Sequence, residues 1–325
     1  MKQNLLGNTG IRVSELSLGT LIFSKMQAAL TVGEGANVVK KGVDLGINFF
    51  DTAASYGSQA HVREGVKGAK DKVVLSTKSH GKVLDVVQKD FETSLRELDR
   101  DYIDIYHFHL VDGTTDLAAR REALDFLVEC KRRGQIRAIG ASVHKVEAAR
   151  AVVAEPDIDV LFPILNFKGL GIRDGSIEDM IDVCRQAHAR GMGIMVMKPL
   201  GGGNLRKSPK EAFDFLRQLG ILDSICVGMK SPAEVEMNVR LFEGRTVPKK
   251  ILSQLETVPR RLRINRFCKG CGACVEACAQ EALSVDCSQA DPSQGKKGHA
   301  VVEEDKCILC GYCAEACPEF GIRVV

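Results

Sequence analysis

Short, almost continuously apolar runs recur roughly every 25 to 35 residues along the first three quarters of the chain. The stretches between them carry apolar residues at helical spacing. In residues 84–98 these are Leu84, Val87, Phe91, Leu95 and Leu98. Short apolar runs indicate buried strands, and a spacing of three or four residues indicates amphipathic helices. A hairpin that turns at residues 8–10 is expected before the first run. We expect strands in residues 16–21, 47–53, 73–77, 103–110, 136–143, 160–165, 193–200 and 224–229.

Eight buried strands, each followed by a helix, predict a parallel sheet that is covered on both faces and closed into a barrel. An open, doubly wound sheet is the competing fold. Against it, no G-x-G-x-x-G motif follows the first strand, and the cluster Gly201, Gly202 and Gly203 follows the seventh, where barrels tend to bind phosphate. We therefore predict the α/β class and a (β/α)8 TIM barrel in residues 1–245.

The remaining residues predict a connector and a second, smaller domain. A chain of 325 residues with 45% hydrophobic content can bury one large core and still form a small module. Residues 246–266 are basic, contain two prolines and are expected to be a linker, and residues 267–325 are expected to form a small α+β ferredoxin-like iron–sulfur domain.

The net charge of +3 is unevenly distributed. Residues 266–325 contain six basic and nine acidic residues, which leaves +6 for the part before them. Neither charge is large enough to favour nucleic acid as a partner. Four arginines at the end of the expected linker are interpreted as solvated residues that face the acidic module; they are Arg260, Arg261, Arg263 and Arg266.

Residues 1–10 lack the basic stretch and apolar run of a secretion signal, and no run approaches the roughly 18 to 20 apolar residues of a membrane span. Eight of the twelve cysteines lie in two short clusters, which is unlike a disulfide framework. We expect a soluble, cytoplasmic protein without a membrane span. The four remaining cysteines are scattered singly at Cys130, Cys184, Cys226 and Cys287.

Each cysteine cluster has the spacing C-x2-C-x2-C-x3-C, and proline follows the second cluster whereas Ala279 follows the first. Three thiolates of such a run ligate one 4Fe-4S cluster, and the fourth ligates the other. Structural zinc is the alternative, because C-x2-C pairs also suit tetrahedral zinc. The spacing favours two 4Fe-4S clusters, in a reducing and anaerobic setting. The expected ligand sets are Cys268, Cys271, Cys274 and Cys317 for one cluster, and Cys307, Cys310, Cys313 and Cys278 for the other.

Four polar residues follow or end the second, third and fourth expected strands: Asp51, Tyr56, Lys78 and His109. Barrel enzymes place their chemistry at this end of the strands. A lysine ammonium near a phenol favours the phenolate, so we expect Lys78 to lower the pKa of Tyr56, with Asp51 holding Lys78 charged. His109 can donate a hydrogen bond to a substrate carbonyl oxygen while Tyr56 protonates it.

The sequences DTAASYG at Asp51 and Tyr56, STK at Lys78 and DIYHFH at His109 resemble the tetrad motifs of the aldo-keto reductase superfamily. The resemblance covers residues 1–243. It implies a barrel that reduces a carbonyl group, or oxidises an alcohol, with a nicotinamide cofactor. The catalytic residues that it implies are Asp51, Tyr56, Lys78 and His109.

The implied nicotinamide site departs from the family at two positions. Phe162 stands where the family commonly has a glutamine, and Glu234 where many members have an arginine for a 2'-phosphate. A carboxylate repels a phosphate and suits a ribose hydroxyl, so NADH is slightly favoured over NADPH, although Lys230 offers an opposing contact. The implied cofactor residues are Gly19, Thr20, Asp51, Ser142, Asn166, Lys198, Pro199, Leu200, Gly201, Gly203, Leu205, Gly228, Lys230, Ser231, Glu234 and Asn238.

Combining the two domains leaves three functional hypotheses, because nicotinamide donates two electrons and the clusters carry one each. The first is a carbonyl or alcohol oxidoreductase that uses nicotinamide, with the iron–sulfur module at or near the mouth of the barrel. The second is a ferredoxin-fed reductase in which the clusters pass electrons directly to the substrate. The third is an electron-transfer partner with a non-catalytic barrel. A ferredoxin or another redox protein is a candidate partner.

Overall fold

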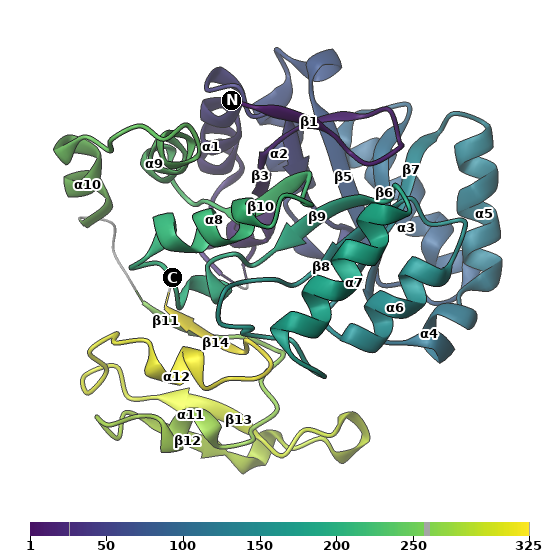
Figure 1. Ribbon diagram of the computed structural model, residues 1–325. Coiled ribbons are helices and arrows are strands. Elements are labelled where there is room, and N and C mark those ends of the chain that lie inside the picture. Colours follow the sequence, from purple (N-terminus) through teal and green to yellow (C-terminus); the bar gives the residue numbers. More distant parts are fainter. Residues whose placement is uncertain (26, 257–260, 325) are drawn as a thin grey trace.

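A computed structural model describes residues 1–25, 27–256 and 261–324, in which eight parallel strands close into a barrel (Figure 1). Each strand pairs with the one that follows it along the chain, and the last pairs with the first. The predicted TIM barrel is therefore confirmed. Its strands are β3 (Leu16–Gly19), β4 (Phe49–Asp51), β5 (Val74–Ser79), β6 (Ile103–Val111), β7 (Ile136–Val143), β8 (Val160–Pro163), β9 (Gly193–Met197) and β10 (Ser224–Gly228).

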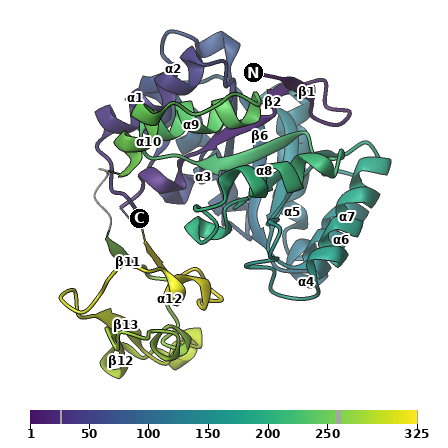
Figure 2. The ribbon, with the colours of Figure 1, turned by 60° about the vertical axis from the view of Figure 1, so that its left-hand side comes forward.

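Helices alternate with the strands and cover the outside of the barrel (Figures 1 and 2). Helix α3 spans Leu84–Leu98, the range that the apolar spacing predicts, and buries Val87, Phe91 and Leu98. None of the helices in the described residues is both long enough and apolar enough to cross a membrane. The other barrel helices are α1 (Val32–Asp44), α2 (Gln59–Val66), α4 (Thr114–Ala118), α5 (Arg121–Arg132), α6 (Val146–Ala154), α7 (Ile177–Ala189), α8 (Pro209–Gln218) and α9 (Pro232–Phe242).

An N-terminal hairpin closes the end of the barrel at which the strands begin. It consists of β1 (Gln3–Leu5) and β2 (Arg12–Ser14), and its loop donates a hydrogen bond from Asn8 N to Gly191 O, 2.8 Å away, just before β9. Side chains from the hairpin, including Leu6, pack with those that fill the interior of the barrel. The opposite end, where the strands finish, is left for the functional site.

The last part of the chain forms a small module below the barrel in Figure 1. Its two antiparallel strand pairs enclose a small core that includes cluster cysteines. The segment expected as a linker contains α10 (Lys249–Glu256) and β11, and β11 belongs to the sheet of the module because it pairs with the C-terminal strand. The module consists of β11 (Leu262–Ile264), α11 (Ala273–Glu276), β12 (Leu283–Asp286), β13 (His299–Val302), α12 (Tyr312–Glu315) and β14 (Ile322–Val324).

The module contacts the barrel at the loops that follow β8 and β9. The Phe320 ring, 4% exposed, lies so close to Gly171 and Gly202 that a Cβ atom at either glycine would come within 2.1 Å and 2.7 Å of it, respectively. Asn204 Nδ2 donates a hydrogen bond to Ala314 O, 3.3 Å away. These contacts place the module at the mouth of the barrel, as the sequence led us to expect.

Candidate functional site

The four expected catalytic residues lie together at the C-terminal end of the barrel. Asp51 is the last residue of β4, Lys78 lies on β5 and His109 on β6, while Tyr56 ends the short 3-10 helix η2 (Ala54–Tyr56) after β4. Consecutive parallel strands finish at the same rim, which brings these side chains to the wall of one cavity.

Asp51 and Lys78 form a buried ion pair, with Lys78 only 1% exposed. Lys78 Nζ donates to Asp51 Oδ1 at 2.7 Å, to Asp51 Oδ2 at 2.6 Å and to Thr52 O at 2.6 Å. Ser76 Oγ donates to Asp51 Oδ1 at 2.6 Å. Burial raises the pKa of Asp51, and the Lys78 ammonium opposes that rise. The pair fixes Nζ 5.1 Å from the centre of the Tyr56 ring.

Tyr56 and His109 lie within reach of one substrate atom. The Tyr56 hydroxyl is 3.3 Å from His109 Nε2, and the two rings meet edge to face. Burial lowers the pKa of His109 well below its usual value, so the imidazole is neutral near pH 7. A neutral imidazole and a phenol can each donate one hydrogen bond to a carbonyl oxygen.

His80 is a site residue that the sequence analysis did not identify. Its ring stacks on that of His109 with 3.8 Å between the ring centres, and it lines the same cavity. Burial, with Arg120 as the next cause, lowers the pKa of His80 to about 4. The sequence could have indicated His80 only through its position, two residues after Lys78 and directly after β5.

The pKa of Tyr56 differs from the expectation drawn from the sequence. Burial and the negative charge of Asp51 raise it well above the ordinary value, and the cation that lowers it is Arg323 of the module. Lys78 does not take this role because its charge is compensated by Asp51, which it contacts through both carboxylate oxygens. Tyr56 is thus a protonated phenol at neutral pH.

These shifts predict an activity that is insensitive to pH in the weakly acidic range. His80 becomes protonated only as the pH falls toward about 4, burial keeps the pKa of His109 well below its usual value, and burial raises the pKa of Tyr56 well above its own. We expect kcat of a reaction in which Tyr56 and His109 donate hydrogen bonds to change by less than about twofold between about pH 5.5 and 7.5, where an ordinary histidine titrates. A rate profile with an inflection near pH 6.5 would contradict this assignment.

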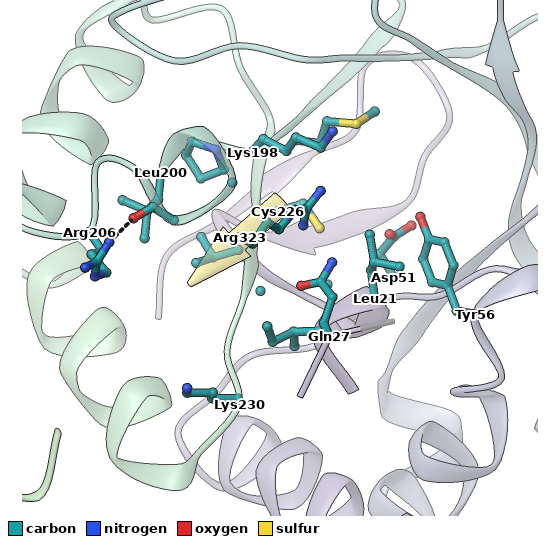
Figure 3. Close-up of a pocket in the computed structure, with 18 of the residues that line it drawn as sticks. Leu21, Gln27, Asp51, Tyr56, Lys198, Leu200, Arg206, Cys226, Lys230 and Arg323 are labelled. Atoms are coloured by element: carbon teal, nitrogen blue, oxygen red, sulfur yellow. Dashed lines mark hydrogen bonds between the residues drawn. The ribbon is translucent and has the colours of Figure 1, made fainter. Parts of the chain in front are cut away.

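The cavity has a volume of about 400 Å³ and extends from the tetrad to the loop after β10 (Figure 3). In Figure 3, Asp51 and Tyr56 lie together on one side of it and Lys230 lies apart from them. Many of the expected cofactor residues line its wall. They are Gly19, Asp51, Lys198, Pro199, Leu200, Gly203, Gly228, Lys230, Glu234 and Asn238.

Two of the expected cofactor residues, Ser142 and Asn166, do not reach the cavity. Ser142 Oγ accepts a hydrogen bond from Leu110 N at 2.9 Å, and both ends of the Asn166 amide bond to the backbone of Leu170, at 2.9 Å and 3.0 Å. Phe162 is buried in the wall. The remaining expected residues that are not in the wall are Thr20, Gly201, Leu205 and Ser231.

The part of the cavity near α9 fits the adenosine end of a dinucleotide. Asn238 Oδ1 is buried there and has no hydrogen-bond partner among the described residues, as expected of an atom that meets a ligand. Glu234 Oε2 accepts a hydrogen bond from Lys230 N at 2.7 Å, which holds its carboxylate at the start of the helix. The expected cofactor residues near α9 thus fit a dinucleotide better than Ser142 and Asn166 do, because those two side chains bond to nearby backbone groups.

The eight clustered cysteines divide between two small cavities in the way that the spacing predicts. The fourth cysteine of each run lies with the first three of the other run, so each cavity has four thiols in its wall. This arrangement suits a cubane, in which four irons each take a separate thiolate. The sets are Cys268, Cys271, Cys274 and Cys317, and Cys278, Cys307, Cys310 and Cys313.

Backbone amides point at three of these sulfur atoms. Ala300 N donates to Cys268 Sγ at 3.3 Å, Gly321 N to Cys317 Sγ at 3.2 Å and Ala282 N to Cys278 Sγ at 3.4 Å. Hydrogen bonds of this kind stabilise thiolate and tune cluster potentials. In residues 1–25, 27–256 and 261–324, no group of three His, Cys, Asp or Glu side chains converges as a single metal ion would require.

Comparison with known proteins gives two matches along the chain. Residues 15–220 match the model of the aldo/keto reductase family, and residues 267–321 match the 4Fe-4S dicluster domain. The first region contains the tetrad, and the second contains the eight clustered cysteines.

Individual relatives resemble the barrel. L-galactose dehydrogenase of Arabidopsis thaliana is 24% identical over 299 residues, which covers 78% of this chain and 92% of that protein. Aldo-keto reductase YhdN of Bacillus subtilis is 30% identical over 183 residues, 51% of this chain and 54% of its own length. A solved structure from Pseudomonas aeruginosa, classed as an aldo-keto reductase, has a TM-score of 0.62 and 26% identity, covering 74% of this chain and 93% of that one.

Proposed function

Because the chain belongs to the aldo/keto reductase family and carries a 4Fe-4S dicluster domain, we propose that it reduces a carbonyl group or oxidises the corresponding alcohol at the tetrad. The observation that carries this proposal is the 3.3 Å separation of the Tyr56 hydroxyl and His109 Nε2 in the wall of the cavity. One carbonyl oxygen can receive a hydrogen bond from both groups there.

Each residue of the site has a separate role in the proposed reduction. Tyr56 holds the proton that the carbonyl oxygen takes up, because burial keeps the phenol protonated. His109 is neutral and orients the oxygen, and the buried ion pair of Asp51 and Lys78 holds Lys78 Nζ 5.1 Å from the centre of the Tyr56 ring. When bound, a nicotinamide supplies the hydride.

We propose that the cofactor is NAD(P)H, with NADH slightly preferred. Lys230, Glu234 and Asn238 would hold the adenosine end, and Gly19, Lys198, Pro199, Leu200, Gly203 and Gly228 would line the path to the tetrad. The Glu234 carboxylate lies where a 2'-phosphate would meet a like charge.

A fluorescence titration of the oxygen-free holoprotein with each reduced cofactor tests the preference. We expect NADH to bind about tenfold more tightly than NADPH, the size of one unfavourable contact of about 1.4 kcal/mol. Glu234→Gln should reduce the difference, and Glu236→Gln, a nearby change on the same helix outside the cavity wall, should leave it unchanged. Tighter binding of NADPH to the unmodified protein would refute the preference.

We further propose that residues 267–325 hold two 4Fe-4S clusters, that residues 1–245 form the catalytic domain and that residues 246–266 connect them. The four thiols around each small cavity support this assignment. When bound, the clusters carry single electrons, and a ferredoxin or another redox protein would exchange electrons with them. Because thiolate ligands are kept reduced in the cytoplasm, we place the protein there.

A second candidate is a reductase in which the substrate receives electrons by way of the iron–sulfur module without nicotinamide. The internal hydrogen bonds of Ser142 and Asn166 favour it, since neither side chain reaches the cavity. Adding NADH to the holoprotein with a carbonyl substrate separates the two. Consumption of NADH supports the first proposal, and turnover with reduced ferredoxin alone supports the second.

A further inference from the structure

Arg323 brings a guanidinium group from the iron–sulfur module into the cavity of the barrel. It lies on β14, it is 9% exposed and it lines the same cavity as the tetrad. Figure 3 shows the β14 strand at this cavity, with Arg323 labelled beside Cys226. Its Nε donates to Phe320 O at 3.1 Å, which fixes the plane of the group. Among the described residues, no carboxylate pairs with it.

Two other basic groups of this wall are paired with carboxylates. Arg173 pairs with Glu319 at 2.7 Å, and Lys78 pairs with Asp51. Lys198 is a second basic side chain without an ion pair in the described part of the chain, and its Nζ lies 4.0 Å from the centre of the Phe320 ring. Lys198 Nζ and the Arg323 guanidinium carbon thus lie 4.0 Å and 5.5 Å from the centre of the Phe320 ring, and both residues line the cavity without forming an ion pair among the described residues.

A buried guanidinium without an anion is unfavourable, and proteins usually supply a partner for one. Burial lowers the pKa of Arg323 only to about 10, so the group stays charged near pH 7. The planar guanidinium donates two parallel hydrogen bonds to a carboxylate. An oxyanion of the ligand is thus the missing partner.

The position of Arg323 relative to Tyr56 indicates which end of a ligand it would meet. Its charge lowers the pKa of Tyr56, while Cys317 and then Tyr56 raise the pKa of Arg323, and Arg323 and Tyr56 line the same cavity. Tyr56 is the group that would protonate the carbonyl oxygen. Because Arg323 and Tyr56 line one cavity of about 400 Å³, the oxyanion that Arg323 meets would share this cavity with the reacting carbonyl.

We propose that Arg323 binds a carboxylate of the substrate, so that the protein acts on carbonyl acids of the 2-oxo type and on their hydroxy acid counterparts. This inference rests on the proposed function of the tetrad for its chemistry, but the binding that it describes does not require turnover. The module then completes the substrate site with a residue that the barrel itself does not contain. The other source of an oxyanion, the pyrophosphate of a dinucleotide, is distinguished by experiment.

The test compares binding of benzoylformate with binding of its methyl ester, measured by calorimetry on the oxygen-free holoprotein. We expect the acid to bind about 10- to 100-fold more tightly than the ester, the effect of a charged hydrogen-bonded pair. Arg323→Gln should remove this difference, and Arg323→Lys should keep part of it. Lys297→Gln, at an exposed lysine of the module outside the cavity wall, is the control and should change neither affinity.

Equal affinities of the unmodified protein for acid and ester would overturn the proposal, whether or not the variants fold. A loss of NADH affinity in Arg323→Gln without loss of benzoylformate affinity would also overturn it and assign the guanidinium to the dinucleotide. If the acid binds through Arg323 but is reduced by neither nicotinamide nor reduced ferredoxin, the proposed function of the tetrad fails and the assignment of Arg323 stands.

Discussion

Replacing Tyr56 by phenylalanine is expected to lower kcat for carbonyl reduction by about 10²- to 10⁴-fold, the usual contribution of a general acid. The ring and its packing against His109 remain, and only the hydroxyl that faces His109 Nε2 is lost. Steady-state rates with saturating carbonyl substrate measure the effect. The visible absorption of the iron–sulfur clusters should not change, because Tyr56 lines the barrel cavity and neither of the cysteine cavities.

The matched control is Tyr102→Phe. Tyr102 lies just before β6, at the opposite end of the barrel, where its hydroxyl is 3.5 Å from Arg100. Removing this hydroxyl changes a weak contact far from the cavity, so kcat should stay within about twofold of the unmodified rate. Full activity of Tyr56→Phe would show that another group donates the proton.

Replacing Cys271 by serine is expected to remove about four of the roughly eight iron atoms per chain, because one thiolate ligand of one cubane is lost. Cys271 lies in the wall of the same small cavity as Cys268, Cys274 and Cys317. Iron and sulfide analysis, together with visible absorption, measures the loss. The other four thiols surround a separate cavity, so the second cluster should keep its absorption.

Cys287→Ser provides the control for this experiment. Cys287 is exposed, belongs to neither cysteine cavity, and its Sγ lies 4.0 Å from Val285 O. The iron content of this variant should equal that of the unmodified protein. If Cys271→Ser kept its full iron content, or if Cys287→Ser lost iron, the ligand assignment would have to be revised.

The barrel could be predicted because its periodicities are strong and local. Strand β7 spans Ile136–Val143 and α3 spans Leu84–Leu98, the ranges that the apolar patterns define. A continuous apolar run and a three-to-four-residue spacing each reflect burial of one element against its neighbours. The division of the eight cysteines between two sites likewise follows from spacing alone, since the short loops of a cubane site leave little freedom.

Contacts between distant segments could not be predicted. The pairing of β11 with β14 depends on how residues on either side of the cysteine clusters meet, and no local pattern encodes that register. Arg323 looked like one more charged residue near the end of the chain. Its position in the cavity wall depends on the packing of Phe320 against Gly171 and Gly202 of the barrel, which no local pattern encodes.

Two details of the site also depend on three-dimensional packing. The bidentate pairing of Lys78 with Asp51 compensates the charge that we expected to act on Tyr56. Ser142 and Asn166 occupy the expected positions in the sequence, but their polar atoms bond to nearby backbone groups. Residue type and spacing predict which groups are present, and the hydrogen bonds of the folded chain decide which of them face a ligand.

The module places one of the two cysteine cavities near the cavity of the barrel. The cysteine cavity that includes Cys317 is also lined by Glu319 and Ile322, the residues just before Arg323. A short stretch of chain therefore runs from the expected cluster ligands to the wall of the barrel cavity. This arrangement is compatible with both proposals for the electron source of the substrate, a nicotinamide or the iron–sulfur clusters.

The central claim, reduction of a carbonyl at the tetrad, is tested most directly by mixing the oxygen-free holoprotein with NADH and following nicotinamide and cluster absorption together. With a carbonyl acid present, we predict that NADH is consumed while the clusters stay unchanged, and that Tyr56→Phe consumes almost none. Without the carbonyl, NADH should persist. If neither NADH nor NADPH is consumed with any carbonyl acid, the account is contradicted.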